Sequence, residues 1–270
     1  MTDDFFHKVI QAIKTSRKYR SLNLPDEMLL DILQKEVATH NRPKDIEVAF
    51  RGKVHNIVAP YLDNVNYAQE MINIQDAFED NDPQIIRAYC LHILTQHAST
   101  KERIPSLGSF YKTLFDIVGQ PTSILDLACG LNPFSLPWMG LDRSVAYYAY
   151  DIHKPRIDLI NHFFTLSNRP ALAFHQDILV SPPQEKADLA FFFKEAHRFE
   201  KREPGCNRQF WHSLKVSTLL VSLPTSDLKH HHDLIPRHRQ LVEHALKGEV
   251  WPITEIIIDD EIVFIIKKHA

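Results

Sequence analysis

Apolar residues in the first hundred positions recur at the spacing of helices. From Phe5 to Ile13 they appear at intervals of three and four, behind the capping acids Asp3 and Asp4. Further helices are predicted to begin at Pro25-Asp26 and at Pro43-Lys44-Asp45, and two more to lie around 67–78 and 83–96. We therefore expect residues 1–104 to form an all-helical N-terminal domain, a bundle of about 100 residues.

After residue 104 the pattern changes to short apolar runs separated by helical or loop segments. The runs cover 123–128, 145–151, 171–177, 187–194 and 218–224. Strands that alternate with helices indicate an α/β fold with a parallel, doubly wound sheet. Residues 255–258 and 262–266 then flank Asp259-Asp260, which predicts an antiparallel hairpin. A parallel sheet finished by a hairpin fits a class I (Rossmann-like) methyltransferase domain over 105–270 better than a dinucleotide dehydrogenase.

Composition excludes several classes of protein. No run approaches the roughly 18–20 apolar residues that a membrane span needs, and the acidic start argues against a secretory signal. The three cysteines, Cys90, Cys129 and Cys206, form no C-x-x-C pair, so neither a disulfide framework nor a metal site is indicated. We expect reduced thiols in a cytoplasmic protein without a membrane partner.

Charge is distributed unevenly, although the formal net charge is only −3. The stretch from Phe5 to Pro25 holds no acid but five Lys or Arg residues, whereas the stretch from Asp63 to Asp82 holds six acids and no Lys or Arg. The small net charge does not indicate a nucleic-acid binder. The local basic stretch nevertheless marks one part of the helical domain as a candidate surface for an anionic partner.

The strongest motif lies at the end of the first predicted strand, in Ile124–Pro133. An apolar strand with the acid Asp126 runs into a tight turn at Gly130. Glycine permits the backbone to approach a cofactor that crosses the carboxyl ends of the strands. The alternative is an ordinary strand-to-helix turn.

The spacing of further acids favours the cofactor site. Asp151 ends the next strand, 21 residues after Gly130, where an acid holds the hydroxyl pair of a ribose. Gln176-Asp177 ends the third strand, where adenine would lie. The G-x-G-x-x-G phosphate fingerprint is absent from the sequence, so a nucleoside cofactor without phosphates fits best. We therefore predict that the cofactor is S-adenosylmethionine.

Two segments carry a family resemblance. His97–Arg103 and Asp126–Pro133 resemble the aminoglycoside-resistance 16S rRNA (guanine-N7) methyltransferases, which act at position 1405. Shorter matches run in order along nearly the whole chain: Ser16–Arg20, Asp151–His153, Gln176-Asp177, Phe193-Lys194 and Ser222–Thr225.

The resemblance implies roles for particular residues. Arg103 would pair with the carboxylate of the cofactor, since a guanidinium grips a carboxylate bidentately. Asp151 would hold the ribose, and Phe193 would close the pocket. The other implied cofactor contacts are His97, Ala98, Ser99, Thr100, Lys101, Glu102, Ala128 and Gly130 at the methionine end, Asp177 and Ile178 at adenine, and Arg202. A charged helix face is the alternative for the segment from His97 to Arg103.

The chemistry expected of this site needs no general base. Enzymes that methylate exocyclic amines place Asn/Asp-Pro-Pro-Tyr/Phe after the fourth strand, where this chain has Phe193–His197. Methylation at carbon 5 of pyrimidines needs a cysteine nucleophile, and neither Cys129 nor Cys206 stands in a suitable place. Guanine N7 has a free lone pair, so alignment of the reactants suffices.

The predicted partner is 16S rRNA within the assembled 30S subunit, bound by a monomer. The target guanine must leave its stack to enter the pocket. Lys194 either contacts it or is a solvated lysine at a strand end. Candidate phosphate contacts are Lys14, Arg17, Lys18, Arg20, Arg42, Lys44, Arg51 and Lys53, with solvated helix faces as the alternative.

One loop departs from the family. After Ser222–Thr225 the family continues with a basic residue and a glycine, whereas this chain has Ser226–Asp233 with three consecutive histidines. Lys229 and Arg237 could replace the missing basic residue, and consecutive histidines rarely converge on one metal ion. Two alternatives therefore stay open: methylation of another RNA base, and a module that binds cofactor and RNA without catalysis.

Overall fold

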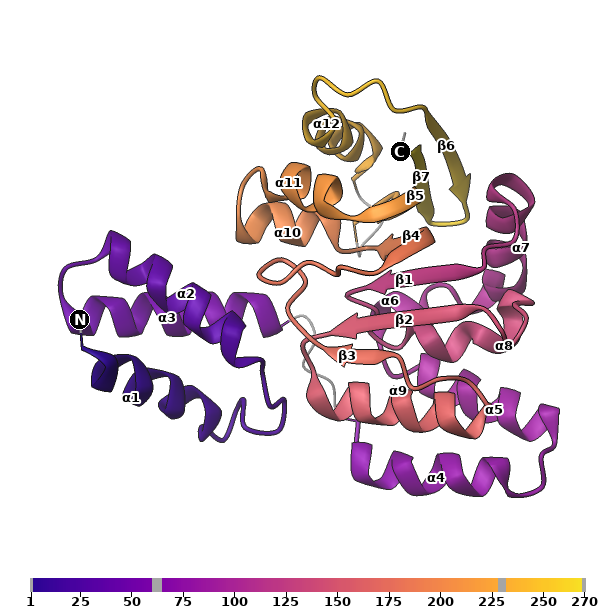
Figure 1. The fold of residues 1–270 in the computed structure, drawn as a ribbon, viewed down its shortest axis with the longest axis horizontal. Coiled ribbons are helices and arrows are strands. Elements are labelled where there is room, and N and C mark those ends of the chain that lie inside the picture. The colour runs from indigo at the N-terminus through magenta and orange to yellow at the C-terminus, as the bar shows by residue number, and fades with distance from the viewer. Residues whose placement is uncertain (1, 60–64, 228–231, 269–270) are drawn as a thin grey trace.

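The computed structural model describes residues 2–59, 65–227 and 232–268. Three helices form a separate lobe, at the left of Figure 1: α1 (Asp3–Lys14), α2 (Asp26–Thr39) and α3 (Pro43–Val58). Their apolar faces meet in a cluster of their own, which includes the fully buried Leu33 and Phe50. The lobe therefore has its own core, as the helical periodicity predicts.

The sheet has seven strands in the order β3-β2-β1-β4-β5-β7-β6. The first five strands pair in parallel, and β7 and β6 add an antiparallel hairpin beside β5. Both the doubly wound sheet and the hairpin of the sequence analysis are confirmed. The strands are β1 (Ser123–Leu127), β2 (Ala146–Asp151), β3 (Ala173–His175), β4 (Lys186–Phe193), β5 (Lys215–Pro224), β6 (Ile253–Ile258) and β7 (Glu261–Lys267).

Helices cover both faces of the sheet (Figure 1). One face meets α4 (Tyr67–Glu79), α5 (Pro83–Leu94), α7 (Leu107–Val118), η3 (Asn132–Ser135), α8 (Leu136–Met139) and α9 (Lys154–Leu166). The other meets α10 (Ala196–Arg202), α11 (Cys206–Ser213) and α12 (Ile235–Ala245). Successive strand residues alternate between the faces, so Phe191 joins the first layer and Phe192 the second. Among the described residues, no helix is long and apolar enough to cross a membrane.

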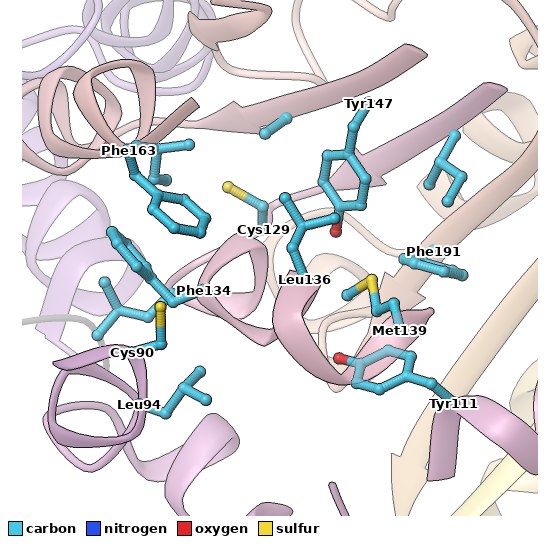
Figure 2. Close-up of a cluster of buried hydrophobic side chains, with 14 of the residues drawn as sticks. Cys90, Leu94, Tyr111, Cys129, Phe134, Leu136, Met139, Tyr147, Phe163 and Phe191 are labelled. Atoms are coloured by element: carbon cyan, nitrogen blue, oxygen red, sulfur yellow. The ribbon is translucent and has the colours of Figure 1, made fainter. Parts of the chain in front are cut away.

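Helices α4 and α5 pack with the sheet, although we expected them in the helical domain. Ile74 of α4 and Cys90 of α5 belong to the same buried cluster as the strand residues. Figure 2 shows Cys90 beside Phe134, whose ring stacks on Phe163 at a centroid distance of 4.8 Å. Periodicity reveals that a helix has an apolar face but not which surface that face covers. The domain boundary at residue 104 stays a prediction.

Substitution of Ile74 tests this packing. Ile74 is fully buried, so Ile74→Ala should lower the free energy of unfolding by about 2–5 kcal/mol. The three tryptophans of the chain, Trp138, Trp211 and Trp251, all lie beyond α7, so urea denaturation followed by tryptophan fluorescence reports on the α/β domain. Ile72→Ala, on the exposed side of the same helix, is the control and should change stability by less than about 0.5 kcal/mol. Equal midpoints for the two variants would contradict the assignment of α4 to the sheet's core.

Candidate functional site

Two adjoining cavities lie at the carboxyl ends of the parallel strands. The larger has a volume of about 420 Å³ and the smaller about 20 Å³, and Ala128 lines both. Predicted cofactor residues in the larger cavity are Ala128, Asp151, Asp177, Ile178 and Arg202. Those in the smaller one are His97, Ser99, Thr100, Arg103, Ala128, Gly130 and Phe193. Eleven of the fourteen predicted cofactor positions therefore meet along one continuous track, with Ala128 counted once.

The turn after β1 forms the floor of this track. Ala128 and Gly130 both adopt left-handed backbone conformations, with φ of 52° and 53°. Glycine accepts this geometry freely, whereas alanine holds it at a cost that the surrounding hydrogen bonds must offset. The Cys129 amide donates to the Tyr150 carbonyl, and the Gly130 amide donates to Asp151 Oδ2 at 3.0 Å. The turn is therefore fastened to the end of β2.

Asp151 is a buried, oriented carboxylate. Its Oδ2 accepts from Gly130 and from Arg156 Nη1, each at 3.0 Å, and its Oδ1 accepts from the His153 amide at 2.8 Å. Burial alone would raise the pKa of Asp151, but the charges of Arg156 and His153 and the hydrogen bonds that both residues donate together outweigh burial and hold this pKa below its usual value. A carboxylate has about four acceptor positions, and these bonds use three. An ionised Asp151 can thus accept one further hydroxyl from a ligand.

At the end of β3, Asp177 is buried and paired with a cation. Its Oδ2 lies 2.7 Å from Arg202 Nη2, and its Oδ1 accepts from the Leu179 amide at 3.0 Å. Both Asp177 and Arg202 line the larger cavity, together with the apolar side chain of Ile178. This corner offers a flat aromatic ligand an apolar surface beside polar groups.

Arg103 lies at the far end of the track, buried against two aromatic rings. Its Nε and Nη2 donate to Glu261 at 2.9 and 2.8 Å, and its Nη1 donates to Asn132 Oδ1 at 2.9 Å. The guanidinium carbon lies 4.2 Å from the ring centroid of Phe110 and 4.7 Å from that of Phe193. These bonds use three of its five N–H donors. The bidentate partner in the structure is thus a protein carboxylate, Glu261.

Lys194 directly follows β4 with a left-handed backbone, at φ 61°. Its Nζ lies 2.6 Å from Glu102 Oε2 and 3.4 Å from Glu261 Oε1. The side chain is buried and paired, so the alternative of a solvated lysine does not describe it. Lys101, Ala98 and Glu102 do not line either cavity, and Glu102 reaches the site through Lys194.

Glu261, which the sequence analysis missed, joins two predicted site residues. Burial would raise the pKa of this carboxyl, but Arg103 and Lys194 together hold it below its usual value. Glu261 opens β7 and pairs in register with Pro224 at the carboxyl end of β5. The signal was present in the sequence, because an antiparallel hairpin returns its second strand beside the end of the preceding parallel strand.

The comparisons with known proteins agree with this geometry. Residues 15–265 match the family described as ribosomal RNA methyltransferase (FmrO). The chain belongs to this FmrO family. It is 29% identical to the 16S rRNA (guanine(1405)-N(7))-methyltransferase of Serratia marcescens, over 97% of this chain and 98% of that protein. Identity to the enzyme of the same name from Micromonospora echinospora is 27%, over 98% of both chains.

Two solved structures of 16S rRNA methyltransferases have the same fold as this chain. The 16S rRNA methylase RmtB superposes with a TM-score of 0.77 at 29% identity, over 98% of both chains. The 16S rRNA methyltransferase RmtF in complex with S-adenosyl-L-homocysteine superposes with a TM-score of 0.82 at 23% identity, over the whole of both chains. The FmrO-family chain therefore matches along its whole length, including the helical lobe.

Most of the predicted RNA contacts of this FmrO-family chain lie exposed on the helical lobe. Arg17, Lys18 and Arg20 follow α1, and Arg42, Lys44 and Arg51 lie before or on α3. Three of the candidates are paired with acids of the lobe: Lys14 contacts Asp26 at 2.5 Å, Arg42 contacts Asp45 at 2.6 Å, and Lys53 contacts Glu36 at 2.6 Å. Arg237 is exposed on α12, and Lys229 lies outside the described residues.

Asp126 links the glycine turn to the Arg103 network. Its Oδ2 accepts from Tyr147 Oη at 2.6 Å and from Asn132 Nδ2 at 3.0 Å, and Asn132 in turn accepts from Arg103. Burial raises the pKa of Asp126 to about 7, although both donors oppose this shift. The folded protein therefore holds a proton on Asp126 well above the pH at which the unfolded chain releases it.

This shift predicts a pH-dependent difference between wild type and Asp126→Asn. Because the folded pKa lies above the unfolded value of 3.8, the group favours folding at low pH, and this contribution is lost as the pH rises toward about 7. Asn removes the titration, so the stability of the variant relative to wild type should increase over that interval, by up to about 1.4 kcal/mol per pH unit, and then level off. Urea denaturation of both proteins from about pH 5 to about pH 8 measures this difference. A difference that does not vary with pH would show that Asp126 is ionised throughout.

Proposed function

We propose that this chain transfers a methyl group from S-adenosylmethionine to N7 of guanine 1405 in the 16S rRNA of the assembled 30S subunit, and so gives resistance to aminoglycosides. The main support is the match to relatives named for this activity, which extends over nearly the full chain. The acids at successive strand ends support it, because they stand where a nucleoside cofactor needs partners.

The residues of the two cavities suit S-adenosylmethionine. A volume of about 420 Å³ lies within the range of ligand pockets. Asp151 would accept a ribose hydroxyl with its remaining acceptor position, and Ile178 and Asp177 would meet adenine. The methionine end would run over Gly130 toward Arg103, whose remaining donors would meet the carboxylate. We assign the other predicted residues that line the cavities to the cofactor on the same grounds: His97, Ser99, Thr100, Ala128, Phe193 and Arg202. Ala98, Lys101 and Glu102 lie outside this lining, and their assignment rests on the family resemblance alone.

Bound S-adenosylmethionine would supply an electrophilic methyl group on a sulfonium. Guanine N7 carries a free lone pair, so this chain's residues need to orient the base and exclude water, and no proton has to be removed. We assign Lys194 to the side of the target base. Its ammonium is held by Glu102 and Glu261, and this pairing offsets the lysine charge. A compensated lysine avoids repulsion with the positive charge that develops on guanine as N7 is methylated.

The lobe α1–α3 would hold the enzyme on the subunit, acting as a monomer. The exposed side chains of Arg17, Lys18 and Arg20 would contact phosphates, which position a protein without reading sequence. We assign the same role to Arg42, Lys44 and Arg51, which are exposed before or on α3, and to Lys14, Lys53, Lys229 and Arg237.

Mapping of the methylated base tests the proposed function. Purified small subunits are treated with the protein and S-adenosylmethionine, then with borohydride and aniline, which cleave RNA at N7-methylguanine. Reverse transcription should stop at guanine 1405 with wild type. Asp151→Asn keeps the shape but loses the charge that meets the ribose, so it should reduce the rate by more than about tenfold. A stop at another base, or none with a folded protein, would refute the proposal.

Reversal of charge in the helical lobe tests the docking role. Changing Arg17, Lys18 and Arg20 to Glu should abolish subunit binding and methylation, because phosphate contacts release counterions and weaken steeply with salt. Calorimetric cofactor affinity and thermal stability should stay nearly unchanged.

A matched control carries the same change of charge at the opposite edge of the sheet. Arg143, Lys186 and Lys215 are exposed near the N-terminal ends of β2, β4 and β5, away from the site. Their reversal to Glu should leave subunit binding and its salt slope close to wild type. If both triple variants lose subunit binding equally, the loss results from the change in net charge. The helical lobe would then not be the docking surface.

A further inference from the structure

The larger cavity has a wall that does not come from the α/β domain. Lys53, Asn56 and Ile57 of α3 line it, opposite the strand ends that carry Asp151 and Asp177. These three residues are spaced by three and four positions, so they form one face of the helix. The helical lobe therefore encloses the part of the cavity where the proposed function places adenosine.

Direct contacts hold the lobe at this position. The Lys154 amide at the start of α9 donates to the Leu22 carbonyl of the lobe at 3.1 Å, and Lys35 of α2 contacts Glu203 at 2.6 Å. Ile152 packs against the apolar cluster of the lobe and also lines the cavity. One side chain thus touches the lobe's core and the cavity at once, so the placement of α3 and the shape of the cavity depend on each other.

The side chains on this face of α3 fit an adenine. Ile57 adds to the apolar lining that Ile152, Ile178 and Phe199 provide, and such surfaces cover the flat faces of the base. Asn56 is exposed and carries a donor and an acceptor on one amide. This is the pairing that asparagine uses toward the N6 and N7 edge of adenine.

We propose that Asn56 and Ile57 are cofactor-binding residues and that the helical lobe closes the adenosine end of the site. This inference rests on the proposed function, which places the cofactor in this cavity. The same helix carries Arg51 and, at its start, Lys44, which are exposed and assigned to RNA. One rigid helix therefore contacts the cofactor with one face and the subunit with another.

A thermodynamic consequence follows from this shared helix. When the subunit fixes the lobe, it also fixes one wall of the cofactor site. Cofactor binding then loses less conformational entropy, because this wall is already ordered. Coupling between binding sites is reciprocal: the subunit raises cofactor affinity by the same factor by which the cofactor raises subunit affinity.

Calorimetry with S-adenosyl-L-homocysteine on the full-length protein tests the proposal. Asn56→Ala and Ile57→Ala should each weaken binding by about three- to tenfold, the loss expected for one hydrogen bond or one partly buried apolar contact. Val48→Ala is the matched control, since Val48 is 66% exposed on the same helix and does not line the cavity. It should bind like wild type.

Two comparisons distinguish a failure of this inference from a failure of the proposed function. Ile57 also packs against the lobe's core, so Asn56→Ala, which removes only an exposed amide, serves as the variant that cannot act through folding. If wild type binds and Asp151→Asn does not, while Asn56→Ala and Ile57→Ala both bind normally, the inference is wrong and the proposed function stands. If wild type itself does not bind, the proposed function fails with it.

The coupling between subunit binding and cofactor binding is tested by measuring cofactor affinity with and without small subunits. Saturating small subunits should raise the affinity of wild type for S-adenosyl-L-homocysteine by at least about threefold, within the usual range of allosteric coupling. Ile57→Ala should lose most of this gain, whereas Val48→Ala should keep it. Equal affinities of wild type with and without subunits would overturn the coupling.

Discussion

The contact between Arg103 and Glu261 is the constraint on which the site depends. A buried ion pair gains little net stability, because both charges leave water, but removing one partner costs about 3–5 kcal/mol. Here the two carboxylate oxygens meet Nε and Nη2 of one guanidinium, which packs against the rings of Phe110 and Phe193. The geometry is therefore strict: the segment before α7 and the start of β7 can pack in only one relative position.

The same pair organises the neighbouring strand ends. Arg103 reaches Asn132 in the turn after β1, Asn132 reaches Asp126, and Glu261 also faces Lys194 at the end of β4. Chains of hydrogen bonds in a low dielectric strengthen one another, and each unpaired member would be costly. Lys194 is held in its left-handed backbone by its ion pairs in this network and by its amide, which donates to the Ser222 carbonyl. Ala128 is held in its own left-handed backbone by the bonds of Cys129 and Gly130 to the end of β2.

The sequence predicted local structure well and long-range packing poorly. The helices at Pro25-Asp26 and Pro43 begin where the prolines and acids indicate, and the hairpin turns at Asp259-Asp260. Such features follow from residues close together in the chain. Glu261 was missed because its role depends on Arg103, 158 positions away. The wall from α3 was missed for a related reason: periodicity describes a helix but not where its lobe docks.

The position of β7 affects the order in which the protein can be assembled. This strand follows the other six described strands in the chain, yet it lies inside the sheet between β5 and β6. During synthesis Arg103 and Lys194 leave the ribosome long before Glu261 exists to neutralise them. We expect the half-made α/β domain to keep these cations hydrated and the track open, while α1–α3 can already form their separate core. The protein would then acquire its lobe early and its completed site only after the hairpin pairs.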